Sequence, residues 1–151
     1  MLLLLLGGVL LIIGAVFAFK KPAASKAAIE VNGTPSLKVD KQKVDLGNVK
    51  LGQTVDVKFT LSNVGDQPLR FSKAPYVEVL EGCWPPTPTI GSMVLNPGDT
   101  TTLDMKFMMH AGMDGMHDFE VHIPSNDSAW GDKTLTVLSN WVPWGLIMAC
   151  K

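Results

Sequence analysis

Sulfur and imidazole side chains concentrate in one stretch of this chain of 151 residues, between residues 105 and 122. All three histidines and five of the eight methionines fall there. Thioether and neutral imidazole groups suit Cu(I) and related soft ions. Two glycines, Gly112 and Gly115, would let the segment turn tightly around such an ion. The stretch is therefore a candidate Cu(I)-binding hairpin loop.

The candidate metal ligands are the soft side chains of this loop and one distant thiol: Met108, Met109, His110, Met113, Met116, His117 and Cys83. A second interpretation stays open beside this one. Met105 and Met109 would continue the inward face of a strand and pack in the core, and the other methionines would contact a partner. We expect His122 to lie on an outward strand face, in contact with solvent.

Strands must position this loop, because apolar and polar residues alternate on both sides of it. Residues 55–62 alternate strictly, and residues 102–107 and 118–123 do the same. Shorter candidate strands are residues 37–40 with 44–46, 69–71, 76–80, 93–95 and 134–138. Turn-forming pairs such as Gly47-Asn48 separate them. About seven short strands without a soluble helix predict an all-β fold, an antiparallel β-sandwich.

Counting strands predicts which loops lie together. Consecutive antiparallel strands reverse direction, so alternate loops lie at the same end of a sandwich. The loop at residues 83–90, the loop at 108–116 and the chain after the last strand should therefore share one end. The N-terminal linker should enter at the opposite end.

Composition excludes some classes of function. Lysine and arginine number 13 against 14 acidic residues, a net charge of −1, so no basic face for nucleic acid is expected. The sequence has no phosphate-cradling glycine loop and no evident catalytic constellation. We expect a protein that is not an enzyme.

The N-terminus is an apolar run from Leu2 to Phe19, followed by Lys20 and Lys21. Its 18 residues are near the lower end of the roughly 17–25 that span a bilayer as a helix. A cleaved secretory signal ending near Ala18 is the alternative. We expect a transmembrane anchor at 1–19, a linker at 20–35, a sandwich at 36–142 and an apolar tail at 143–151.

Several motifs of the predicted sandwich resemble one family. They are Asp45-Leu46-Gly47-Asn48-Val49, Gly52, residues 57–65, Pro68-Leu69, the Gly82-Cys83 loop, Leu95-Asn96-Pro97-Gly98-Asp99 and Ser125-Asn126-Asp127. Together they resemble an uncharacterised bacterial secreted family with an immunoglobulin-like domain of the abnormal-spindle/hydin and major-sperm-protein type, over residues 38–141. The resemblance implies an immunoglobulin-like sandwich and no established activity. Members often carry two cysteines in the loop at Cys83, whereas Trp84 follows Cys83 here.

Location and partners follow from these features. Lysines after the apolar run favour a cytoplasmic location for the domain. The resemblance to a secreted family favours an extracytoplasmic location instead. We expect the domain to be extracytoplasmic, in the periplasm or on the cell surface. Cys83 and Cys150 could form a disulfide, or Cys150 could be free or lipidated. We expect an accessory or assembly subunit of a membrane-associated complex, with copper handling as the alternative. The expected partner-binding residues are Trp84, Pro85, Pro86, Trp141, Trp144, Leu146 and Ile147.

Overall fold

The computed structural model describes residues 26–144, so the anchor expected at 1–19 and most of the expected tail lie outside the described residues. The regular structure of the described part consists of strands. They are β1 (Leu37–Val39), β2 (Lys43–Lys50), β3 (Val55–Asn63), β4 (Leu69–Arg70), β5 (Tyr76–Glu81), β6 (Pro88–Ile90), β7 (Val94–Leu95), β8 (Thr100–Phe107), β9 (Gly115–Pro124) and β10 (Asp132–Val142). Between residues 26 and 144 there is no helix with the length and apolar character needed to cross a membrane.

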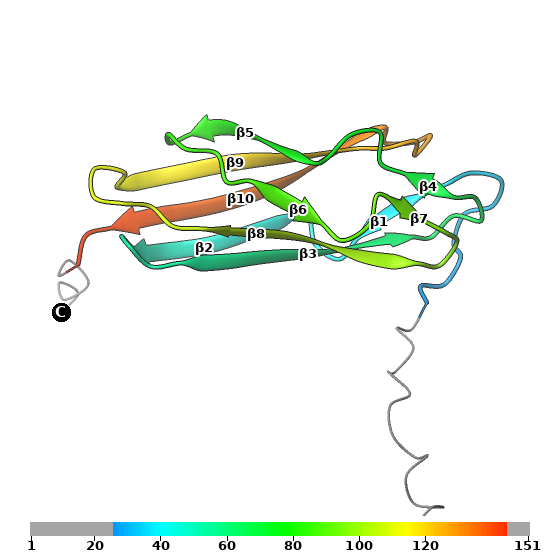
Figure 1. Cartoon of the computed structure of the whole chain (residues 1–151), viewed down its shortest axis with the longest axis horizontal. Coiled ribbons are helices and arrows are strands. Elements are labelled where there is room, and N and C mark those ends of the chain that lie inside the picture. Colours follow the sequence, from blue (N-terminus) through cyan, green and yellow to red (C-terminus); the bar gives the residue numbers. More distant parts are fainter. Residues whose placement is uncertain (1–25, 145–151) are drawn as a thin grey trace, which may run out of the picture.

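Eight of these strands form two layers that run along the long axis of the molecule (Figure 1). One sheet has the order β1-β3-β8-β6 and the other the order β2-β10-β9-β5. Strands β4 and β7 pair separately as a two-stranded ribbon. This arrangement confirms the predicted all-β sandwich.

Two details of the strand prediction were wrong. The sequence analysis missed β6, which is three residues long and begins at Pro88; a proline is tolerated there because β6 is an edge strand. It also predicted a turn at Gly47-Asn48, whereas β2 continues through both residues. The left-handed φ of Gly47, 59°, accompanies a shift of register against β10 between Leu138 and Asn140.

The sandwich is not purely antiparallel. Strand β2 runs parallel to β10, while the other strand pairs are antiparallel. A parallel neighbour needs a long crossover instead of a hairpin. Here most of the described chain lies between β2 and β10. Local sequence patterns therefore could not predict that these two strands pair.

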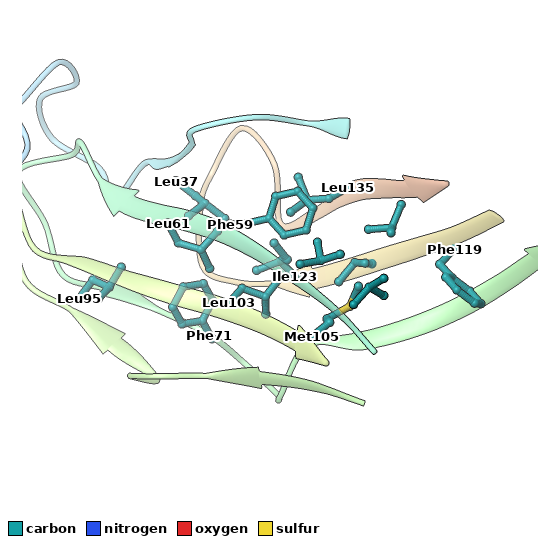
Figure 2. Close-up of a cluster of buried hydrophobic side chains, with 14 of the residues drawn as sticks. Leu37, Phe59, Leu61, Phe71, Leu95, Leu103, Met105, Phe119, Ile123 and Leu135 are labelled. Atoms are coloured by element: carbon teal, nitrogen blue, oxygen red, sulfur yellow. The ribbon is translucent and has the colours of Figure 1, made fainter. Parts of the chain in front are cut away.

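The core lies between the two sheets, and the alternation of the long strands builds it (Figure 2). Every second residue of β3, β8, β9 and β10 points inward, and the opposite residues face solvent. Phe59, Leu61, Leu103, Phe119 and Ile123 are completely buried. Apolar burial along this seam therefore fixes the register of the strands that carry the loops.

Three polar residues also occupy inward strand positions: Asn63, His117 and Ser139. Ser139 is explained by its neighbour, because its hydroxyl oxygen accepts a hydrogen bond of 2.9 Å from the indole Nε1 of Trp141. Asn63 makes four hydrogen bonds to backbone groups. His117 lies near one end of the sandwich, beside Cys83.

The N-terminal linker is tied to the end of the sandwich that carries the β7–β8 turn. The amide of Ala27 donates a hydrogen bond of 2.8 Å to the carbonyl of Gly98, and Lys26 pairs with Asp99 at 3.5 Å. Residues 30 and 31 also bond to the carbonyl of Val64. The chain therefore enters the domain at this end (Figure 1).

Candidate functional site

The opposite end of the sandwich, here called the tip, consists of four segments. They are the β2–β3 turn (51–54), the β5–β6 loop (82–87), the β8–β9 loop (108–114) and the residues after β10 (143–144). Gly52 N donates to the carbonyl of Met109 at 2.7 Å, and Trp144 Nε1 donates to the carbonyl of Leu51 at 2.8 Å. The two loops and the chain after the last strand therefore lie at the same end of the sandwich, as predicted (Figure 1).

Two methionines of the Met/His stretch belong to the core. Met105 and Met109 are each 1% exposed and pack in the main apolar cluster. This confirms the second interpretation of these two residues. Met113 is partly buried against the same cluster.

The remaining soft side chains of the loop point to different surroundings. Met108 is exposed, and its sulfur lies 3.9 Å from the hydroxyl of Thr54. Met116 and His110 are exposed. Among residues 26–144, no three His, Cys, Asp or Glu side chains are grouped so that they could hold a metal ion.

The structure does bring together two of the predicted ligands, Cys83 and His117. His117 is the first inward-facing residue of β9, two positions before Phe119, and its side chain is 1% exposed. Its Nε2 lies 3.8 Å from the Sγ of Cys83, which is exposed and has no disulfide partner among residues 26–144. Cys150 lies outside the described residues.

The position of the imidazole is fixed from three directions. Its Nδ1 lies 3.3 Å from the carbonyl oxygen of Gly115, and its ring is 5.8 Å from the ring of Phe119. On the third side is Gly82, which has a φ of 106°. A Cβ built there would lie 2.3 Å from Cδ2 of His117, so only glycine lets the β5–β6 loop approach this closely.

A buried imidazole needs partners for both ring nitrogens, because an unpaired buried polar group costs about 1–3 kcal/mol. A carbonyl oxygen only accepts hydrogen bonds, so the Gly115 contact places the proton on Nδ1. Nε2 then carries no proton, and its lone pair faces the thiol of Cys83. The arrangement is a thiol and a basic nitrogen held side by side at the surface of the tip.

The expected partner-binding residues are distributed unevenly. Trp84 is 70% exposed and Trp144 is 71% exposed, and both lie at the tip. Pro85 is exposed, whereas Pro86 is buried. Leu146 and Ile147 lie outside the described residues.

Trp141 corrects the expectation that it binds a partner. Its side chain is 1% exposed, because β10 continues to Val142 and places the indole on the inward face. The ring of Phe107 lies 6.1 Å away. Trp141 is therefore a core residue and is not available to a partner.

The sequence analysis expected His122 to be in contact with solvent, but neighbouring side chains cover most of it. It does face outward, but the ring of Tyr76 stacks on it at 4.6 Å and 6°. Its Nδ1 is 3.2 Å from Asp132, and its Nε2 is 3.3 Å from Glu78. Sequence reasoning missed this cluster, which joins edge strand β5 to β9 and β10, because its members come from three strands.

Solved structures share this fold at low sequence identity. A protein of unknown function from Porphyromonas gingivalis W83 is 19% identical, with a TM-score of 0.57 over 80% of this chain and 51% of that one. The secreted serine protease VesC from Vibrio cholerae is 18% identical, with a TM-score of 0.54 over 70% of this chain and 23% of that one. The chain thus spans about half of the first protein and less than a quarter of VesC.

A third structure matches over nearly its whole length. The ASH/PapD-like domain 7 of human CEP192 is 10% identical, with a TM-score of 0.51 over 85% of this chain and 96% of that one. No curated protein sequence matches this chain. At these identities the structural likeness concerns the fold alone.

The sequence itself carries a more specific signal over the same region. A family model described as HYDIN/CFA65/VesB-like, Ig-like domain matches residues 35–139. The match covers every strand from β1 to β9 and most of β10, and it confirms the resemblance drawn from the turn and strand motifs. The chain belongs to the HYDIN/CFA65/VesB-like family of Ig-like domains.

Proposed function

We propose that this chain is a non-enzymatic accessory module of a membrane-associated complex, held at the membrane by residues 1–19 and placed outside the cytoplasm. In this proposal the tip of the Ig-like domain binds a partner protein. Loops at the ends of Ig-like sandwiches are well suited to recognition, because the sheets hold them rigidly while their residues vary freely. The supporting observation is the apolar surface of the tip.

Five large apolar side chains are exposed at the tip: Leu80 (56%), Trp84 (70%), Met108 (42%), Met116 (46%) and Trp144 (71%). They come from β5, β9 and three of the tip segments. Exposed apolar groups that gather in one region are typical of binding surfaces. Tryptophan and methionine are also enriched in the centres of protein interfaces.

Other exposed apolar side chains lie away from the tip and have different surroundings. Tyr76 is stacked on His122, and the ammonium of Lys133 lies 5.4 Å from the ring centre of Trp130. The direction of the chain also favours the tip. Because the linker enters at the opposite end, a module anchored through that linker would present the tip away from the membrane.

The charge of the chain fits contact through apolar groups. The net charge of −1 provides no strong long-range attraction to an oppositely charged partner. Affinity would then depend on burying the exposed tryptophans and methionines, each of which contributes through the apolar area it removes from water. This predicts binding that changes little with ionic strength.

The proposal predicts that the full chain, extracted from its membranes in mild detergent, migrates on native gels with a co-purifying chain. Replacing Leu80 and Trp84 with serine should release the module as a monomer, since both side chains are exposed at the tip. Trp130→Ser is the matched control, because Trp130 is 61% exposed at the linker end of the sandwich and should leave the complex intact. A strictly monomeric wild-type chain, or equal loss in the control, would contradict the proposal.

A further inference from the structure

We infer that Cys83 and His117 form a two-ligand site for Cu(I) at the tip. This inference is independent of the docking proposal. It is narrower than the seven-ligand loop expected from the sequence, because it uses only the two candidate ligands that the structure places together. The two ligands come from different parts of the chain, the β5–β6 loop and the start of β9.

The separation of the two ligand atoms fits an ion between them. Thiolate sulfur and imidazole nitrogen bind zinc at about 2.3 and about 2.0 Å, which places them about 3.5 Å apart in a tetrahedral site and about 4.3 Å apart in a linear one. Bonds to Cu(I) are of similar length. The observed distance from Cys83 Sγ to His117 Nε2 is 3.8 Å, between these limits.

A hydrogen bond between the Cys83 thiol and Nε2 also has this length, so the two groups contact each other directly in the metal-free chain, and a bound ion would replace that contact. His117 is 1% exposed, so its Nε2 is shielded from bulk water and has no closer protein partner. Its other nitrogen is held by the Gly115 carbonyl at 3.3 Å, which sets the tautomer with the lone pair on Nε2. A carbonyl that orients the far nitrogen is a common support for a metal-binding histidine.

The ligand types and their number favour Cu(I) over zinc. Soft thiolate ligands select Cu(I), and imidazole also suits copper. Zinc sites usually have three or four protein ligands, and residues 26–144 provide no group of three His, Cys, Asp or Glu side chains. Two ligands suffice for Cu(I), and the 3.8 Å separation would hold them in a bent arrangement that leaves one side of the ion open. Because Cys83 is exposed, such an ion would be open to exchange with a donor or acceptor.

Gly82 makes the approach of the two ligands possible. A side chain at this position would meet Cδ2, Cγ and Nε2 of His117 at 2.3, 2.7 and 3.0 Å. Its φ of 106° is also a conformation that other residues rarely adopt. A glycine next to the cysteine therefore sets the position of the thiol against the imidazole.

The test is a titration of the full chain, in detergent and without oxygen, with Cu(I) in competition with a chromophoric chelator. The expected result is one Cu(I) per chain, with X-ray absorption showing one sulfur and one nitrogen neighbour. Cys83→Ser should weaken binding by more than about 100-fold, and Gly82→Ala by about 10-fold or more, because it displaces the loop. Circular dichroism checks that each variant is folded.

Two controls separate this site from the other sulfur atoms. Cys150→Ser should leave Cu(I) binding unchanged, and so should the combined change of Met108, Met113 and Met116 to leucine, which keeps apolar volume and removes the thioethers. The inference is overturned if binding is below one ion per chain or if Cys83→Ser binds within about 10-fold of the wild type. It is equally overturned if either control loses as much affinity as Cys83→Ser.

Discussion

Replacing Trp141 with alanine is expected to lower the free energy of unfolding by about 3–5 kcal/mol. The indole is 1% exposed and packs 6.1 Å from the ring of Phe107. Its removal would leave a large cavity beneath the tip and would also break the hydrogen bond from Nε1 to Ser139. Urea unfolding followed by far-ultraviolet circular dichroism measures the change, provided that the dependence on urea stays constant.

Trp144→Ala is the matched control for this prediction, since the same residue type lies three positions further along the chain. Trp144 is 71% exposed, donates one hydrogen bond to the Leu51 carbonyl and lies 4.4 Å from the ammonium of Lys50. An exposed contact of this kind contributes about 0.5–1 kcal/mol. Similar losses for the two variants would show that Trp141 is not the core residue described here.

Asn63→Ala is also expected to cost about 3–5 kcal/mol, as the sum of several unpaired groups at about 1–3 kcal/mol each. Asn63 is completely buried at the end of β3. Its Nδ2 donates to the carbonyls of Gln67 (2.8 Å) and Leu95 (3.0 Å), and its Oδ1 accepts from the amides of Ser36 (3.3 Å) and Gly65 (3.0 Å). One side chain thus holds three separate backbone segments together at the linker end.

Asn140→Ala tests whether the large loss of stability expected for Asn63→Ala arises because the hydrogen bonds of Asn63 are buried. The amide of Asn140 makes one hydrogen bond of 2.8 Å, to the side chain of Asn48 at the solvent face. Its loss should cost less than about 1 kcal/mol, because water replaces the partner. If both asparagines can be replaced at the same small cost, the backbone groups around Asn63 must find other partners, and the account of this end of the sandwich is wrong.

The alternation of apolar residues predicted most of the sandwich core. Phe59 in β3, Leu103 in β8 and Phe119 in β9 are buried as their patterns indicate. Extending the alternation of β9 two residues before Phe119 places His117 on the inward face. Extending the alternation of β10 beyond Leu138 places Trp141 on the inward face as well. The sequence analysis instead gave His117 as a metal ligand and Trp141 as a partner-binding residue, because the glycine, methionine and proline beside them hid the continuation of the strands.

Other features depend on contacts that no local pattern encodes. The parallel pairing of β2 with β10 joins residues more than 90 positions apart, such as Thr136 with Lys43. Strand β6 begins with a proline and is held by pairing with β8. The closeness of Cys83 to His117 depends on the left-handed φ of Gly82, which the sequence permits but does not specify.

The end of the domain on which the candidate site lies was predictable for a simpler reason. The strand count was too low, but β5, β8 and β10 all end at the tip (Figure 1). The loops that carry Cys83 and His110 therefore share that end with the chain after Val142. Which side chains meet there was decided by burial, which took Met109 and Trp141 into the core.

Photo-crosslinking in intact cells tests the central claim, that the tip binds a partner protein, most directly. A photoreactive amino acid would replace Trp84 at the tip in one variant and Trp130 at the linker end in another; these side chains are 70% and 61% exposed. The account predicts a single discrete crosslinked protein from position 84 and none from position 130. A crosslink from position 130 alone, or no crosslinked protein from position 84, would contradict it.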